Sequence, residues 1–210
     1  MQVSRPSPSV KDGYHHGDLR KALLDAAATL LAEGGVDAVS VREAARRLGV
    51  SPRAPYQHFR DKESLLSALA IDAFEQLGRA LVSADDAAAP GQEVEEQAIA
   101  YVQFAQQAPA RFQLMFGPRR GASDSDLGMA KKAAFAVSER RVRELSQPGD
   151  DAEARIVGYW SFAHGLAGLL LDTHLTDLMN VDIPTLIRRA TRATLSRTGA
   201  TPEPGAAELG

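Results

Sequence analysis

The sequence predicts an all-α protein of about nine helices, with an N-terminal three-helix module followed by a larger C-terminal helical domain. Apolar residues recur at helical spacing along most of the chain, and glycine, proline or capping residues separate these periodic segments. No segment shows the alternating pattern of a β-strand. The 210 residues, 44% of them hydrophobic, suffice for one large or two small cores.

The first expected helix ends at a pair of glycines, Gly34 and Gly35. Glycine commonly closes a helix because it adopts the left-handed backbone at little steric cost. The apolar positions of this helix are Leu19, Leu23, Ala26, Ala27, Leu30 and Leu31.

A short second helix is expected between Ser40 and Gly49. Ser40 and Glu43 have the spacing of a capping box, in which the hydroxyl accepts a backbone N–H and the carboxylate reaches back. One face of this helix is apolar, and it comprises Val41, Ala44, Ala45 and Leu48.

Only Val50 and Ser51 remain to form the corner before a third helix, so the two helices must cross sharply. We expect Ser51 to cap the third helix and Pro52 to occupy its first position, where no N–H is needed. Pro55 removes a backbone hydrogen bond one turn later, which predicts a loose first turn and regular helix over about 54–58. Two short helices around a tight corner form a helix-turn-helix, whose natural partner is DNA.

Asp61 is placed to cap a long fourth helix that reaches at least Leu81. Breaks rich in glycine and proline then divide the rest of the chain. The further helices are expected to end near Ala108, to span Pro109 to Phe116, to run from about 125 to Leu145, and to cover roughly 151–175 and 183–197.

The charge is distributed unevenly. The whole chain carries −3, which by itself disfavours contact with phosphate. Residues 1–62 contain ten Lys and Arg against seven Asp and Glu, a balance of +3, and the remainder holds fourteen against twenty, or −6. The positive part coincides with the helix-turn-helix.

The segment from Tyr14 to Leu81 resembles the DNA-binding domain of the TetR/AcrR family of bacterial transcription regulators. The resemblance is carried by the alanine-rich first helix, the run SVREAARRLGVS, the YQHF at Tyr56 to Phe59, and DKESLL from Asp61. YHHGDLR from Tyr14 and WSFAHG from Trp160 further resemble a subgroup whose C-terminal domain carries a Trp and a His-Gly pair.

This resemblance implies a ligand-responsive repressor that binds a palindromic double-stranded DNA operator as a homodimer. It also implies a division of the chain into domains. We expect a flexible N-terminal arm at 1–13, the helix-turn-helix domain at 14–62, a C-terminal regulatory and dimerisation domain at 63–198, and a disordered tail at 199–210.

The DNA-binding candidates divide into base-reading and backbone-contacting residues. Arg53 and Gln57 lie four residues apart and share a helix face, so we expect Arg53 to read guanine and Gln57 to read adenine. Matched family positions and exposed helix N-termini add the remaining candidates. The full set is Ser40, Arg42, Ser51, Arg53, Ala54, Tyr56, Gln57, His58 and Lys62. For Tyr56 and His58, an internal bracing role is the alternative.

The C-terminal domain supplies candidates for an effector pocket and for a subunit interface. The pocket candidates are Phe104, Met115, Phe116, Phe135, Trp160 and His164, although the same residue types also fill ordinary cores. Glycines within an apolar helix suggest close approach of another helix. The interface candidates are Ala163, Ala167, Gly168, Leu171, Leu186, Ile187 and Ala190, with packing inside one subunit as the alternative.

Several functional classes find no support in the sequence. There is no cysteine, no glycine-rich phosphate loop and no nucleophile elbow, so we predict neither an enzyme nor a cofactor. The adjacent His15 and His16 diverge too much for a metal site. No apolar run approaches the ~18 residues of a membrane span, which predicts a cytoplasmic protein. A helical adaptor that uses its helix-turn-helix for protein contact stays open as an alternative.

Overall fold

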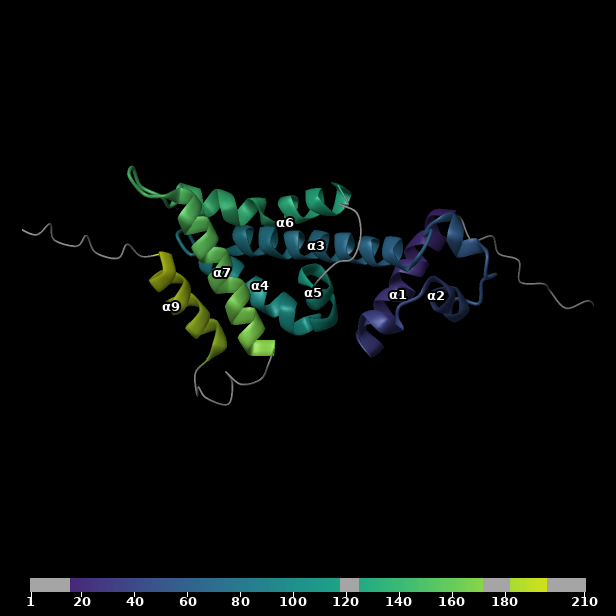
Figure 1. Ribbon diagram of the computed structural model, residues 1–210. Helices are drawn as coiled ribbons and strands as arrows, with labels where there is room; N and C mark the ends of the chain where they lie inside the picture. Colours follow the sequence, from purple (N-terminus) through teal and green to yellow (C-terminus); the bar gives the residue numbers. More distant parts are fainter. Residues whose placement is uncertain (1–15, 118–124, 172–181, 196–210) are drawn as a thin grey trace, which may run out of the picture. The chain divides into compact units, whose positions relative to one another are not determined.

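The computed structural model describes residues 16–117, 125–171 and 182–195. Within these ranges every regular element is helical, and the elements are eight α-helices and one 3₁₀ helix. Figure 1 labels the α-helices. The predicted all-α class is confirmed. The predicted arm at 1–13 and tail at 199–210 lie outside the described residues.

The chain divides into two compact units, Met1–Ala70 and Ile71–Gly210. The boundary between these units falls inside α3, which spans Lys62–Ala87. The long helix begins where expected, because the Asp61 carboxylate accepts a hydrogen bond from the backbone N–H of Ser64 at 2.8 Å.

The first unit contains α1 (His16–Ala38), α2 (Val41–Arg47), the 3₁₀ helix η1 (Ala54–Gln57) and the start of α3. The backbone leaves helical geometry at Gly34 and Gly35, the latter with φ of 66°. This is the predicted interruption, after which the helical assignment continues to Ala38. The core of the unit includes Leu23, Leu31, Ala44, Phe59 and Leu65, each at most 2% exposed.

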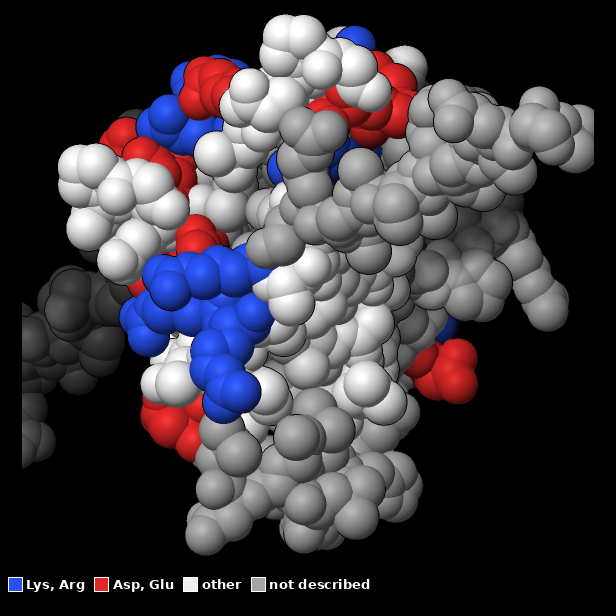
Figure 2. Space-filling model, turned by 90° about the vertical axis from the view of Figure 1, so that its left-hand side faces the viewer, with Lys and Arg blue, Asp and Glu red and all other residues white. Residues whose placement is uncertain are grey.

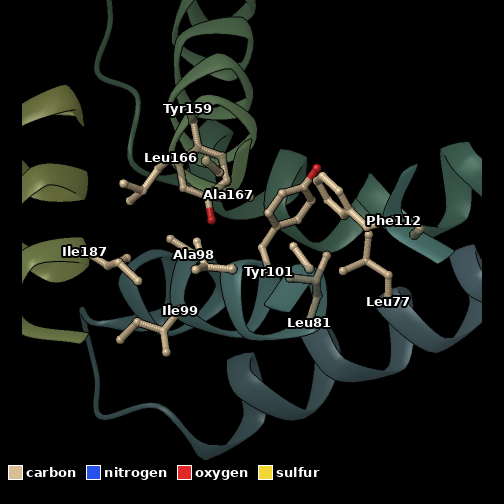
Figure 3. Packing of buried hydrophobic residues seen from close by; sticks show 14 of the residues in the cluster. Leu77, Leu81, Ala98, Ile99, Tyr101, Phe112, Tyr159, Leu166, Ala167 and Ile187 are labelled. Carbon is tan, nitrogen blue, oxygen red and sulfur yellow. The ribbon is translucent and has the colours of Figure 1, made fainter. Parts of the chain in front are cut away.

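The second unit is organised around α4 (Glu93–Gln107). Besides the later part of α3 it contains α5 (Pro109–Phe116), α6 (Ser125–Glu144), α7 (Ala152–Leu171) and α9 (Ile183–Leu195). Helix α4 packs against α5, α6, α7 and α9. Figure 3 shows Tyr101 of α4 beside Phe112 of α5, with Tyr159 of α7 and Ile187 of α9 directed into the same core.

Buried polar groups tie the helices of this unit together. The Asp85 side chain on α3 is 3% exposed and accepts hydrogen bonds from Arg141 at 2.7 and 3.0 Å, from Arg140 at 3.1 Å and from Gln97 at 2.7 Å. The Arg141 guanidinium holds the pKa of Asp85 below its ordinary value. Three helices therefore meet at one carboxylate.

The negative balance of the second unit does not form a uniformly acidic surface. Arg188 and Arg192 of α9 pair with Glu96 and Glu95 of α4, each at 2.7 Å. On the face of the molecule drawn in Figure 2, basic side chains gather in a cluster bordered by acidic ones. None of the helices in the described part of the chain is long and apolar enough to cross a membrane.

Candidate functional site

The corner of the helix-turn-helix is formed by the residues that predicted it. The Ser40 hydroxyl accepts the backbone N–H of Glu43 at 3.1 Å, and Gly49 adopts φ of 66°. The Glu43 carboxylate forms an ion pair with Arg46 at 2.7 Å. The capping box predicts instead that this carboxylate reaches back to the backbone N–H of Ser40. The N–H of Val50 returns to the carbonyl of Ala45 at 3.2 Å, which closes α2.

The element after the corner differs from the prediction. It is a 3₁₀ helix of four residues whose N-terminal flanking residue is Arg53, with no side-chain cap. Ser51 contributes its carbonyl to the N–H of Ala54 at 3.1 Å, and its hydroxyl does not cap the helix. Pro55 is buried in the first turn of η1, where its missing N–H costs no hydrogen bond.

The 3₁₀ geometry changes which side chains share a face. Residues three apart eclipse one another in a 3₁₀ helix, so Arg53 aligns with Tyr56, and Ala54 with Gln57. The expected pairing of Arg53 with Gln57 required an α-helix and is corrected. Arg53, Tyr56 and Gln57 are nevertheless all exposed, and Tyr56 is 49% exposed. Ala54 is half-buried.

The remaining candidates of the first unit separate into outward and inward side chains. Arg42 and Ser51 are exposed, and the ammonium group of the half-buried Lys62 lies 3.5 Å from the carbonyl oxygen of Asp37. His58 is half-buried, and its Nε2 is buried without a hydrogen-bond partner among the described residues. His58 therefore fits the internal bracing alternative better than a phosphate contact.

A pocket of about 370 Å³ opens in the second unit, and four of the six predicted pocket residues line it. Phe104 packs against the core and Met115 is buried in it. Sequence reasoning missed Tyr101, Lys131 and Ser161. We call this the aromatic pocket, and its lining residues are Tyr101, Phe116, Lys131, Phe135, Trp160, Ser161 and His164.

One hydrogen bond fixes the polar chemistry of the aromatic pocket. The Tyr101 hydroxyl lies 2.9 Å from Nδ1 of His164. Burial raises the pKa of the Tyr101 phenol, and burial, assisted by the charge of Lys131, lowers the pKa of His164. A buried phenol that keeps its proton must donate it, and this bond gives it an acceptor. The two pKa shifts favour the uncharged forms of both groups, and in the tautomer in which Nδ1 accepts from Tyr101 the remaining proton of His164 lies on Nε2.

Aromatic rings hold His164 in place. Its ring stacks on Phe112 with centroids 5.3 Å apart and meets Phe116 edge-on at 4.6 Å. Phe135 and Trp160 meet edge to face, and Trp160 also meets Tyr101 edge-on at 6.0 Å. The arrangement is a set of rigid apolar walls with few polar atoms, as is typical of small-molecule sites.

A second hollow of about 980 Å³ is lined by residues of α3 and α6. We call it the α3–α6 groove. It includes the exposed Met129 and the charged residues Glu75, Arg79, Asp86 and Asp126. In the described part of the chain, no group of three His, Asp or Glu is placed to hold a metal ion.

The predicted interface residues fall into two groups. Ala163, Ala167 and Ile187 are at most 1% exposed within the single chain, so their own subunit covers them and a second copy would not contact them directly. Leu171 is half-buried against the same core. Gly168, Leu186 and Ala190 keep partial exposure, and a Cβ at Gly168 would meet no atom within 4 Å.

Two family models match the chain. The model described as "Bacterial regulatory proteins, tetR family" matches residues 23–69, and the model described as "Tetracyclin repressor-like, C-terminal domain" matches residues 94–194. The first covers the helix-turn-helix, and the second covers the helices that form the aromatic pocket.

Individual curated relatives match a short stretch of the chain. Tetracycline repressor protein class D from Escherichia coli is 40% identical over 53 residues, 25% of this chain and 24% of that protein. An HTH-type transcriptional repressor from Mycobacterium tuberculosis is 38% identical over 63 residues, 30% of this chain and 34% of its own length. The chain thus spans only about a quarter to a third of these curated relatives.

A solved structure is similar over nearly its whole length. This protein of unknown function from Rhodococcus sp. RHA1 is 32% identical, with a TM-score of 0.78, and the match covers 88% of this chain and 97% of that one.

Proposed function

Because the chain belongs to the TetR family of bacterial regulatory proteins, we propose that it is a DNA-binding transcriptional repressor. In this proposal a homodimer binds a palindromic operator in the cytoplasm and releases it when a small molecule occupies the aromatic pocket. The observation that carries the proposal is the exposure of Arg53, Tyr56 and Gln57 directly after the corner of the helix-turn-helix, in a unit that the family model matches.

Each reading side chain has a role that follows from its chemistry. Arg53 pairs bidentately with guanine in the major groove, and Gln57 is suited to adenine. Tyr56, eclipsed with Arg53, donates its hydroxyl to a phosphate at the groove edge. Arg42, Ser51 and Lys62 add phosphate contacts, which position the unit without reading sequence.

A dimer supplies the second half-site that a palindrome requires. The outer face of α7 suits close approach of a second copy. Val157 and Leu169 are 63% and 53% exposed, and a Cβ at Gly165 or Gly168 would meet nothing within 4 Å in the single chain. Together with Leu186 and Ala190 of α9, this face is our proposed subunit interface.

The aromatic pocket is our proposed effector site. Trp160, His164 and Gly165 are the residues that resemble the Trp and His-Gly subgroup, and two of them line the pocket. Helix α3 is continuous from Lys62 to Ala87 and contributes residues to both units. A ligand that binds differently to the two arrangements of the DNA-binding units shifts the population between them.

The test is fluorescence anisotropy of a labelled duplex from the region upstream of the protein's own gene. We expect saturable binding that weakens steeply with salt, and protection of a palindrome in a footprint. Lys62→Ala should lower the salt slope by about one unit on every duplex. Absence of binding to any duplex at low salt would reject the proposal and favour a helical adaptor.

A further inference from the structure

The geometry points to an aromatic carboxylate, in its anionic form, as the class of molecule that the aromatic pocket binds. This inference deepens the proposed function and rests on it. The ligand ring lies against Trp160 and Phe135, and the carboxylate lies at the rim with Lys131, Ser161 and His164.

The walls of the pocket select for a ring. Tyr101, Phe116, Phe135 and Trp160 contribute four of its seven lining side chains. Trp160 meets Tyr101 and Phe135 edge to face, and Phe116 meets Phe135 in a tilted contact, so the rings restrict one another's orientation. Rigid aromatic walls favour a ligand with its own aromatic face over a flexible chain, because ring contacts add to the area that is buried.

Lys131, Ser161 and His164 can each donate a hydrogen bond to a ligand at the rim. Lys131 is exposed and has no ion pair among the described residues, and Ser161 is exposed beside it in the lining. In the tautomer in which Nδ1 of His164 accepts from Tyr101, the remaining nitrogen, Nε2, presents an N–H. Three donors, one of them cationic, and no carboxylate among the lining residues match an anion that only accepts.

The α3–α6 groove provides the contrast within the same unit. Its lining includes the carboxylates of Glu75, Asp86 and Asp126 with a single cation, Arg79. Like charges at that surface disfavour an anion there. The charge pattern therefore directs an anionic ligand to the smaller hollow, although the groove has more than twice its volume.

The chain carries its own reporter, because Trp160 is its only tryptophan and lines the pocket. We would titrate the full-length protein with phenylpropionate, with phenylpropionamide and with phenylpropylamine, and follow Trp160 emission. The three probes share a ring and spacer and differ in carrying a negative, neutral or positive head. We expect the carboxylate to bind about tenfold more tightly than the amide, and the amine most weakly.

Two neighbouring lysines make a matched pair of variants. Lys131→Gln should weaken phenylpropionate about tenfold and leave the amide unchanged. Lys132→Gln changes the net charge equally but alters a residue outside the lining, so it should leave both probes unchanged. Lys131→Arg keeps the charge and should retain most of the carboxylate affinity, which covers the case of a poorly folded glutamine variant.

Several results would overturn the inference. They are equal affinity for carboxylate and amide, preference for the amine, equal effects of the Lys131 and Lys132 variants, or no response of Trp160 to any probe at millimolar concentration. The same protein is tested for duplex binding without probe. Duplex binding with failed carboxylate selectivity rejects the ligand class alone, whereas selective carboxylate binding without duplex binding rejects the proposed function.

Discussion

Tyr56 and Tyr101 are the same residue type in two opposite settings. Tyr56 stands on a four-residue 3₁₀ helix of the first unit and is 49% exposed. Tyr101 lies in the middle of α4, is 2% exposed, and contacts Phe112, Trp160 and His164. The first side chain is available to a partner, and the second belongs to the core that it helps to form.

This difference extends to the charged groups of the two units. Arg47 pairs with Glu33 at the surface of the first unit, with the Glu33 side chain 54% exposed. In the second unit, the Asp85 side chain is 3% exposed and accepts hydrogen bonds from two arginines and a glutamine. We infer that binding and stability are separable in the first unit and coupled in the second. The following predictions test this contrast, beginning with the largest effect.

Replacing the two tyrosines by alanine should have opposite consequences. Tyr101→Ala removes a buried ring and should lower the free energy of unfolding by about 3–5 kcal/mol. Tyr56→Ala should change it by no more than about 0.5 kcal/mol, yet weaken binding to duplex DNA. Urea unfolding and anisotropy measure the two quantities. A comparable loss of stability in both variants would break the comparison.

The buried carboxylate gives the next largest effect. Asp85→Ala leaves Gln97 without its acceptor and Arg141 with Glu144 alone, and it should lower the free energy of unfolding by about 3 kcal/mol. The effect lies at the lower end for buried pairs because Arg141 is 30% exposed and can recover water. Glu33→Ala is the surface control and should leave the urea midpoint unchanged. An Asp85 variant as stable as the control would show that the network contributes nothing.

Arg53→Ala tests specificity without stability. The substitution should weaken the binding free energy for the cognate palindrome by about 1–3 kcal/mol and change binding to an unrelated duplex little. The free energy of unfolding should stay unchanged. Arg60→Ala is a suitable control, because Arg60 is 87% exposed, pairs with Asp61 and is not among the proposed reading side chains. Equal losses on both duplexes would reassign Arg53 to the phosphate backbone.

Much of the first unit could be predicted because its structure is determined locally. The Ser40 cap, the turn at Gly49 and the Asp61 cap each depend on residues within one helical turn, and the structure contains all three. The exception is η1. Pro55 indicates a disturbed first turn, but no local pattern indicates that the whole element becomes a 3₁₀ helix and brings Tyr56 into line with Arg53.

The aromatic pocket depends on contacts between distant parts of the chain. Tyr101, Phe116, Phe135 and Trp160 come from four helices, and no local pattern states which side of each helix faces the others. Composition indicated an aromatic site but placed Met115 in it and omitted Lys131. A lysine on an amphipathic helix is ordinarily a solvated residue, so only the tertiary arrangement reveals that this one borders a pocket.

The smallest expected effect concerns the protonation of His164. Tyr101 and Lys131 interact with its imidazole. Burial first, and the Lys131 charge second, lower its pKa in the folded protein. In the unfolded chain the imidazole has its ordinary pKa of about 6.5, so it binds a proton at a higher pH than it does in the folded protein. The free energy of unfolding therefore falls as the pH drops from about 6.5 through the pKa of the folded protein.

NMR titration of the His164 imidazole measures this directly. The wild-type pKa should lie below the ordinary value, Lys131→Gln should raise it toward that value, and Lys132→Gln should move it less. Melting temperatures should fall less steeply on acidification in His164→Asn than in the wild type, because the asparagine takes up no proton in either state. An unshifted imidazole, or parallel melting curves, would mean that His164 is as solvated as a surface residue of the first unit.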